Sequence, residues 1–344
     1  MALLEVLDLR VRFDTVDGSV QAVRGVSFSV DAGHTLGIVG ESGSGKSVST
    51  QAAFGFARGA HVSGRAMFEG RDLLAMSDRE LQAVRGARVG MIFQDPLTSL
   101  HPMYRVGWQI VEAIRAHDRS ITKRAARSRA VELMGRVGIP QPEQRVDDYP
   151  HQFSGGMRQR VMIAMAMALT PSLLIADEPT TALDPTVQAQ ILELLRELKD
   201  DFGTAIIMIT HDLGVIAEIA DDVVVLYAGK VMEEAAVRNL FYHYHHPYTE
   251  GLMASLPSAG VRRGELVPID GQPPSPIDPL SGCPFSPRCR YAMAECAIQA
   301  PTLLEIPGEP RHRSACVLPR DRAARQALAE ARRLPATQGM VLDR

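Results

Sequence analysis

Two stretches near the start of the chain alternate apolar and polar residues, as strands with one buried face do. They are LLEVLDLRVRF (residues 3–13) and VDGSVQAVRGVSFSV (residues 16–30), and the turn between them contains Gly18. Alternation places successive side chains on opposite faces of a strand. The pattern predicts antiparallel strands that form a small β-subdomain.

Farther along the chain, short runs that are almost wholly apolar alternate with stretches that have a helical pattern. The apolar runs are residues 36–40, 173–179 and 205–211, and helices are predicted at residues 46–56 and 185–199. Apolar strands separated by helices are typical of a parallel sheet that is covered on both faces. We therefore expect an α/β core.

The composition changes twice along the chain. Between Gln94 and Pro150, helical segments rich in Arg, Ala, Glu and Val suggest a helical subdomain inserted between two strands of the core. After Tyr248, Pro and Gly become frequent, which indicates an irregular C-terminal module. The expected layout is a core of residues 1–250 with its helical subdomain near residues 95–165, a C-terminal module of residues 251–320, and a charged tail of residues 321–344 predicted to form a fraying helix.

Composition and charge narrow the class of protein. The chain has 344 residues, 46% apolar and 22% charged, which suits a globular protein of two domains. The formal net charge of −3 provides no basic surface, so no nucleic-acid partner is expected. Charges in the first twelve residues argue against a secretory signal, and the longest apolar stretch, residues 161–176, falls short of the roughly 18 residues that span a bilayer. We expect a cytoplasmic chain that meets a membrane only through partners.

A glycine-rich loop follows the first apolar strand. Residues 40–47 fit the pattern G-x(4)-G-K-[ST] between a predicted strand and a predicted helix, which is the context that a phosphate-binding loop requires. Backbone N–H groups and the helix N-terminus would converge on phosphate oxygens, Lys46 would reach the β- and γ-phosphates, and the Ser47 hydroxyl would bind Mg²⁺. The candidate nucleotide-binding residues are Gly40, Ser42, Gly43, Ser44, Gly45, Lys46 and Ser47.

Two carboxylates end the second apolar strand. Asp177 comes at the carboxyl end of this strand, where open α/β sheets bind ligands, so it can hold Mg²⁺ directly or through water. Glu178 is the next residue, placed to accept a proton from an attacking water. An acidic pair after a strand is often only a solvated strand end, but the phosphate loop upstream favours the catalytic interpretation.

A second glycine run points to a known family. Residues 153–160 (FSGGMRQR) place a serine and two glycines before a helix predicted to begin near Arg158, which makes another set of backbone donors for an anion. With the phosphate loop and the acidic pair, this run resembles the signature of the ATP-binding cassette (ABC) family, here with Phe and Met where Leu and Gln are commoner. The resemblance implies an α/β P-loop NTPase core of ABC type, with an antiparallel β-subdomain and an inserted helical subdomain, that binds and hydrolyses ATP.

The resemblance also assigns roles to single residues. ABC cores pair head to tail, so Ser154, Gly155 and Gly156 would contact ATP bound to the partner core, and Asp184 of the run Ala182-Leu183-Asp184 resembles the D-loop at the dimer seam. The remaining matches are Gln94, similar to the Q-loop glutamine that senses Mg²⁺ and the attacking water, His211, similar to the switch histidine at the γ-phosphate, and Phe13, at the position of the aromatic that stacks on adenine. Taken singly, a strand-end histidine is usually a surface residue and an aromatic in such a strand is usually core.

All four cysteines lie in the C-terminal module. Their spacing is C-x(5)-C-x(6)-C-x(19)-C, at Cys283, Cys289, Cys296 and Cys316. A cytosolic setting disfavours disulfides, so clustered thiols suggest a metal or cluster site. The C-x(2)-C pairs usual for zinc are absent, and four thiolates can hold an iron–sulfur cluster as well as zinc. A 4Fe-4S cluster, zinc and unligated thiols all remain open on the residues alone.

The C-terminal sequence narrows the resemblance to one branch of the family. HPYTEGLMASLP (residues 246–257), a Pro-rich link and GCPFSPRC (residues 282–289) are similar to the C-terminal region of the peptide and nickel importers. Some of those proteins hold a 4Fe-4S cluster on such cysteines. The branch implies a peripheral ATPase on the cytoplasmic face of the membrane, with two transmembrane permease subunits, a second and distinct ABC ATPase subunit, and an extracytoplasmic solute-binding protein. Its cargo would be oligopeptides or dipeptides, with nickel as the alternative.

Two other kinds of ABC protein are disfavoured. Soluble ABC ATPases that act on ribosomes or DNA usually carry two cores in one chain or a long coiled-coil insertion, and this sequence shows neither. An exporter half would carry a fused membrane domain. The sequence therefore favours an importer subunit.

Overall fold

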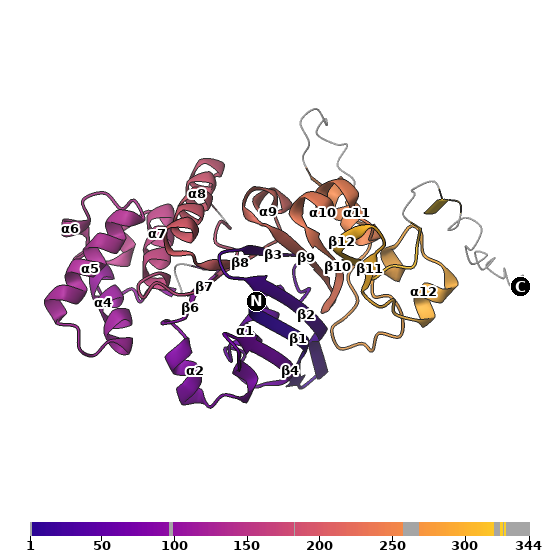
Figure 1. Cartoon of the computed structure of the whole chain (residues 1–344), viewed down its shortest axis with the longest axis horizontal. Helices are drawn as coiled ribbons and strands as arrows, with labels where there is room; N and C mark the ends of the chain where they lie inside the picture. Colours follow the sequence, from indigo (N-terminus) through magenta and orange to yellow (C-terminus); the bar gives the residue numbers. More distant parts are fainter. Residues whose placement is uncertain are drawn as a thin grey trace, which may run out of the picture.

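The computed structural model describes residues 2–95, 99–181, 183–256, 268–319, 324, 325 and 327. Along its long axis the helices α4–α6 lie at one end, the N-terminal sheet and the central sheet lie in the middle, and the C-terminal elements lie at the other end (Figure 1). The strands are β1 (Ala2–Thr15), β2 (Gly18–Asp31), β3 (Thr35–Val39), β4 (Ala60–Phe68), β5 (Arg71–Asp72), β6 (Val89–Ile92), β7 (Leu173–Asp177), β8 (Ala205–Thr210), β9 (Asp222–Tyr227), β10 (Lys230–Ala236), β11 (Leu304–Ile306) and β12 (Glu309–Ser314). The α-helices are α1 (Lys46–Ala53), α2 (Asp78–Val84), α4 (Val106–His117), α5 (Lys123–Arg136), α6 (Pro142–Arg145), α7 (Gly155–Ala166), α8 (Pro185–Phe202), α9 (Leu213–Ile219), α10 (Val237–His243), α11 (Pro247–Ala254) and α12 (Ala294–Ile298).

The central sheet has eight strands in the order β11-β12-β10-β9-β3-β8-β7-β6. Its strands from β9 to β6 pair in parallel, as the apolar pattern predicts. Every residue of β3, β7 and β8 is buried. Strands β3 and β7 lie on either side of β8 and run parallel to it. The loops at the carboxyl ends of these three strands therefore meet at one edge of the sheet.

The two predicted core helices differ slightly from their expected bounds. Helix α1 ends at Ala53 rather than at residue 56, because Gly55 follows in the left-handed region with φ +70°. Helix α8 runs on past residue 199 to Phe202 and ends at Gly203, whose φ is +63°. In both cases a glycine sets the end of the helix.

The predicted antiparallel strands form a second sheet in the order β2-β1-β4-β5. Its buried side chains pack with those on one face of the central sheet in a common core that includes Leu4, Phe28 and Ile38. Helix α1 packs against this β-subdomain as well (Figure 1). The β-subdomain therefore lies directly beside the phosphate loop.

Helices α4 to α7 are inserted between β6 and β7, as predicted. Helix α7 begins at Gly155, however, and not near Arg158. The Ser154 side chain accepts a hydrogen bond from the Met157 N–H at 3.3 Å and so caps the helix. Both signature glycines therefore lie in the first turn of α7.

The C-terminal region is less irregular than its Pro and Gly content predicts. Strand β12 pairs with β10, through Glu233 opposite Ser314 and Glu234 opposite Arg313, and β11 pairs with β12. The helix expected at residues 321–344 lies outside the described residues, apart from residues 324, 325 and 327. Among the described helices, none combines the length and the apolar character needed to cross a membrane.

Candidate nucleotide site

The phosphate loop folds tightly because its glycines permit close backbone contacts. Gly40 has φ +151°, and a Cβ on it would lie 2.1 Å from the Leu226 carbonyl oxygen. Gly45 caps α1 in a left-handed conformation, and its Cβ would lie 2.6 Å from the Ala22 carbonyl oxygen. A side chain at either position would push the loop off the strands beside it. The loop therefore follows a close path into the start of α1, and the contact of its N–H groups with phosphate oxygens stays a prediction.

Lys46 lies inside this loop. Its side chain is 6% exposed, and its Nζ donates to the carbonyl oxygens of Gly40 at 2.8 Å and Glu41 at 3.0 Å. Burial lowers the pKa of Lys46, although nearby carboxylates, of Glu178 first, act to raise it. The ammonium is thus held within the loop by backbone oxygens, in the position from which it could bind phosphate oxygens.

Ser47 and Asp177 meet beside the loop. The Ser47 hydroxyl donates to Asp177 Oδ1 at 2.7 Å, and Gln51 Nε2 donates to Oδ2 at 3.4 Å. Burial raises the pKa of Asp177, and the hydrogen bond from Ser47 opposes that rise. A hydroxyl and a carboxylate at this distance are the oxygen ligands that Mg²⁺ uses in nucleotide sites. The donor set therefore fits the predicted Mg²⁺.

Three side chains converge on Glu178. Gln94 Nε2 donates to Glu178 Oε2 at 2.9 Å, the Thr181 hydroxyl donates to the same oxygen at 2.9 Å, and His211 Nδ1 lies 3.2 Å from Oε1. Burial acts to raise the pKa of Glu178, but the bonds from Thr181 and His211 outweigh it and hold the pKa below its usual range. The carboxylate is therefore ionised and oriented, as a proton acceptor must be.

The backbone of Glu178 is strained. Its φ is +48°, in the left-handed region that non-glycine residues enter at a cost of about 1–3 kcal/mol. The hydrogen bond from its N–H to the Ile209 carbonyl, at 2.8 Å, holds it there. Strain of this kind is concentrated at functional sites, and here it turns the side chain toward Gln94 and His211.

The four residues predicted to act on the partner's ATP lie elsewhere. Ser154 and Gly155 are exposed at the start of α7, and Gly156 lies so near α8 that a Cβ on it would be 2.8 Å from Val187 Cγ1. Asp184 is exposed and caps α8, accepting from the N–H groups of its second and third residues at 3.1 and 3.0 Å. These two helix starts form one surface. Ala182 lies outside the described residues.

Phe13 is placed differently from the other predicted residues. It pairs with Val20 across β1 and β2 and with Ala60 across β1 and β4. Its half-buried ring packs against the core of the β-subdomain. Phe13 is therefore packed as an aromatic residue of a core usually is. The predicted contact of Phe13 with adenine stays a prediction.

Sequence analysis missed three residues that support the phosphate loop. They are Glu41 within the loop, Tyr248 and Arg288, which are joined by hydrogen bonds. Tyr248 belongs to the HPYTEGL run, and Arg288 belongs to GCPFSPRC. Both runs carried the family resemblance, but no local pattern indicated that they contact the loop.

The four cysteines gather in the C-terminal module as free, half-buried thiols. The Cys283 N–H donates to the Cys296 carbonyl at 2.7 Å, and burial raises the pKa of Cys289 to about 12 and that of Cys316 to about 11. In the described part of the chain, only one group of three or more metal-type ligands has its atoms all within 4.8 Å, and it contains no cysteine. Among the described residues, no three of the thiols therefore lie within that distance of one another.

That single group consists of His245, Glu309 and His312. Glu309 Oε2 lies 3.2 Å from His245 Nε2 and 2.7 Å from His312 Nδ1. His312 Nε2 lies 2.8 Å from Glu233 Oε1, and both residues are fully buried. The three residues could hold a cation. The contact of His312 with Glu233 joins the β11–β12 hairpin to β10, and that of Glu309 with His245 joins it to the segment between α10 and α11.

Two family models match the chain. The model described as ABC transporter matches residues 23–181, and the model described as oligopeptide/dipeptide transporter, C-terminal region, matches residues 232–296. The first match contains the phosphate loop, the signature and the acidic pair. The second begins in β10 and takes in three of the four cysteines.

Similar curated proteins share both parts. The oligopeptide transport ATP-binding protein OppD of Bacillus subtilis is 54% identical over 310 residues, which cover 88% of this chain and 86% of that protein. OppD of Salmonella typhimurium is 51% identical over 318 residues, or 92% of this chain and 94% of its own length. The dipeptide transport ATP-binding protein DppD of Bacillus subtilis is 50% identical over 297 residues, which cover 86% of this chain and 88% of that protein.

Solved structures support the same fold. The post-hydrolysis dimer of the ATP-binding cassette MJ0796, bound to ADP and Pi, has a TM-score of 0.62 at 25% identity and covers 68% of this chain and 99% of its own. The cbiO1 protein of Clostridium perfringens, part of the cbiONQ transporter complex, has a TM-score of 0.60 at 29% identity. The match covers 70% of this chain and 90% of the cbiO1 chain.

Proposed function

The chain belongs to the ABC transporter family of ATPases, and from that premise we propose that it energises an importer of oligopeptides or dipeptides across the cytoplasmic membrane. The observation that carries the ATPase part is the convergence of Gln94, Thr181 and His211 on Glu178, next to the bonded pair of Ser47 and Asp177. The cargo is supported by the C-terminal match and by the names of the relatives.

Each group in the site has a definite task in hydrolysis. ATP and Mg²⁺ supply the phosphoryl group and its counter-charge when bound. Lys46 and the loop N–H groups bind phosphate oxygens, while Ser47, Asp177 and Gln94 would hold the ion. Glu178 accepts the proton of the attacking water at its carboxylate, whose Oε2 is held by Gln94 and whose Oε1 is held by His211.

The start of helix α7, with its serine and two glycines, supports the proposed partners. Ser154, Gly155 and Asp184 are exposed and Gly156 is half-buried beside them, so we propose that these four residues contact ATP bound by a second ABC ATPase subunit. Closure and reopening of that dimer would drive two permease subunits that contact the region around Gln94 and helices α4–α6. A solute-binding protein would deliver the peptide on the far side of the membrane, while this chain stays peripheral on the cytoplasmic face.

We further propose a 4Fe-4S cluster on Cys283, Cys289, Cys296 and Cys316. The four free thiols lie in one module, and four thiolates can hold such a cluster, which would be structural. Protein purified without oxygen should contain four iron and four sulfide per chain by chemical analysis. Stoichiometric zinc without iron would reject this assignment.

The function as a whole is tested by purification of the chain from gently solubilised membranes of its host. We expect two multi-span permeases, a second ATPase and a solute-binding protein to copurify, as identified by mass spectrometry. The ligand of that binding protein would then distinguish peptides from nickel. Ribosomal proteins or DNA-repair factors in place of permeases would overturn the transport role and leave only the ATPase.

A further inference from the structure

Two side chains from the C-terminal part of the chain hold Glu41 of the phosphate loop. The Glu41 N–H donates to Tyr248 Oη at 2.9 Å. Its carboxylate oxygens lie 3.0 and 2.8 Å from Arg288 Nη1. The side chains of Arg288 and Glu41 are 5% and 26% exposed, so the ion pair is shielded from solvent and from salt.

Arg288 is itself fixed by the module from which it comes. Its Nη2 donates to the Ile269 carbonyl at 3.0 Å, its Nε donates to the Asp270 carbonyl at 2.9 Å, and its Nη1 also donates to Tyr227 Oη at 3.2 Å. A guanidinium is a rigid fork, so these bonds fix the position of the charge that Glu41 meets. The module therefore sets where the loop carboxylate lies.

The charge of Glu41 matters because of what the loop must bind. Its carboxylate is close enough to act on the pKa of Lys46, so it would also act on a phosphate at that lysine. An unpaired carboxylate there would repel a triphosphate. Paired with Arg288, it presents little net charge to the ligand.

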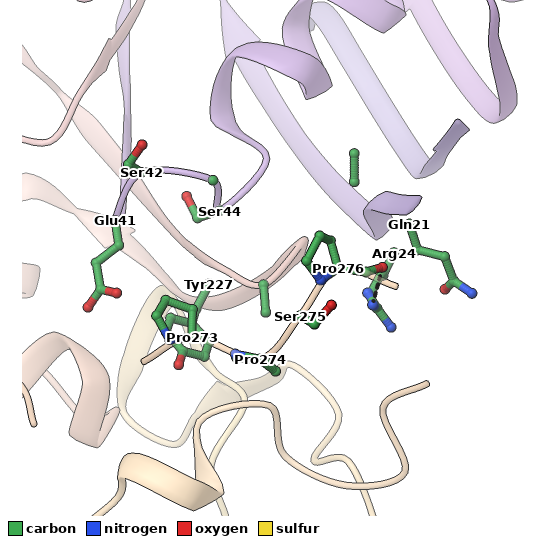
Figure 2. Close-up of a pocket in the computed structure, with 13 residues that line it drawn as sticks. Gln21, Arg24, Glu41, Ser42, Ser44, Tyr227, Pro273, Pro274, Ser275 and Pro276 are labelled. Atoms are coloured by element: carbon green, nitrogen blue, oxygen red, sulfur yellow. Dashed lines mark hydrogen bonds between the residues drawn. The ribbon is translucent and has the colours of Figure 1, made fainter. Parts of the chain in front are cut away.

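A second contact lies on the other side of the same loop. Residues 273–276 (Pro-Pro-Ser-Pro), here called the proline segment, face Ser42 and Ser44 across a pocket (Figure 2). The Pro276 carbonyl accepts from the Gln21 N–H and from Arg24 Nη2, both at 2.9 Å. Strand β2 thus holds the proline segment beside the phosphate loop.

The position of this pocket identifies the part of the ligand that it meets. A nucleotide with its β- and γ-phosphates at Lys46 and Ser47 must extend its nucleoside outward from the loop. Gln21 lines the pocket, and its neighbour Val20 pairs with Phe13 in the β1–β2 ladder. The pocket therefore lies beside the end of the ladder that carries the residue predicted to stack on adenine.

We infer that the C-terminal module is a working part of the ATP site, in which Arg288 neutralises and positions Glu41 beside the phosphates while the proline segment bounds the nucleoside. This inference rests on the proposed ATPase function and adds residues that lie outside the matched ABC model. Arg288 acts through Glu41 and is a positioning residue. The proline segment would touch the ribose or base directly.

The electrostatic half is tested by ATP binding to the full-length chain, measured by calorimetry. Arg288→Gln should weaken ATP binding about tenfold, or about 1.4 kcal/mol, and should weaken binding of inorganic tripolyphosphate similarly. Arg288→Lys should retain most of the affinity. The double variant Glu41→Gln with Arg288→Gln should regain it, because it leaves no unpaired carboxylate. Arg311→Gln is the matched control, since Arg311 also joins this module to the core, through Asp222 at 2.8 Å.

The steric half is tested by Ser275→Trp, which would fill the pocket. ATP binding should fall at least about tenfold while tripolyphosphate binding stays unchanged, because only ATP carries a nucleoside. The electrostatic role is overturned if the wild type binds ATP and the Arg288→Gln variant binds it as tightly as the Arg311→Gln control. It is also overturned if the double variant binds ATP as weakly as Arg288→Gln. Unchanged ATP binding by Ser275→Trp would overturn the proline-segment contact. If wild type itself fails to bind ATP with Mg²⁺, the ATPase proposal fails instead.

Discussion

The chain has two surfaces that we propose bind phosphate, and they are built in opposite ways. Around the phosphate loop, Lys46 and Asp177 are buried and bonded within the chain, and Glu178 is held by three neighbours. At the signature, Ser154 and Gly155 are exposed, and the described polar contact of the serine side chain is its own helix cap. One surface is preorganised by the fold, and the other is left open.

This contrast shows which parts of the catalytic site a single chain can hold in position by itself. A buried charge needs partners before the ligand arrives, because desolvation is costly. An exposed helix start costs nothing to maintain, and its N–H groups remain available for an anion on another subunit. Changes at the first surface should therefore affect this chain's own site, and changes at the second should affect only the assembled dimer.

The largest effect is expected for Glu178→Gln. The amide cannot accept the proton of water, so ATP turnover in the assembled complex should fall about a hundredfold to ten-thousandfold, while ATP affinity stays near wild type. Phosphate release and nucleotide binding measure the two quantities. Glu193→Gln, on the exposed side of α8, is the matched control. Turnover near that of the control would remove Glu178 from the role of general base.

A change at the open surface should separate binding from turnover. In Ser154→Arg a long cationic side chain covers the start of α7, so turnover in the complex should fall at least about a hundredfold, as when an anion-binding donor is lost. ATP binding by the isolated chain should not change. Ser77→Arg removes a similar cap from α2 and controls for the lost capping bond. Weaker ATP binding by the isolated Ser154→Arg chain would contradict the separation of the two surfaces.

A smaller effect is expected for Asp184→Ala. The side chain caps α8, so its removal should lower the free energy of unfolding by about 1 kcal/mol, as measured by urea denaturation. Asp184→Asn keeps the cap and should keep the stability. If the Asn variant nevertheless lowers turnover in the complex, the charge of Asp184 acts across the dimer. Equal stability of the Ala variant and wild type would show that the cap contributes nothing.

The smallest effect is expected for Thr181→Ala, and only in acid. The Thr181 bond helps to hold the pKa of Glu178 below its usual range, so its loss should raise that pKa. Glu178 would then become protonated at a higher pH as the solution is acidified, and the acid limb of the turnover profile should move to higher pH. Activity at neutral pH should barely change. Thr186→Ala, at an exposed position of α8, is the control and should leave the pH profile of turnover unchanged. If Thr181→Ala gave the same profile as this control, the Thr181 bond would have no effect on the pKa of Glu178.

Local patterns in the sequence predict most of this architecture. The apolar runs at β3, β7 and β8 identify the parallel core, and the glycine-rich loop with Asp177 predicts the metal-type pair that the structure contains. The start of α7 was placed three residues too late, because glycine disfavours helix interiors and the cap on Ser154 was not considered. The strands β11 and β12 were missed, since both are short and largely polar.

Contacts between distant residues could not be predicted in this way. Glu41 and Arg288 are 247 positions apart, and neither lies in a pattern that specifies its partner. The thiol cluster is a similar case, since spacing alone indicated a site but not its geometry. Burial and pairing at such range depend on how the whole chain folds, and no window of local sequence contains them.

The hairpin of β11 and β12 bears on how a shorter form of this protein would behave. A chain cut near residue 250 would keep every motif of the ATPase but would lack β12, so the outer edge of β10 would be exposed. Glu233 would also lose its hydrogen bond with His312. An open strand edge recruits strands from other molecules. Such a fragment should precipitate or form β-rich aggregates rather than serve as a minimal enzyme.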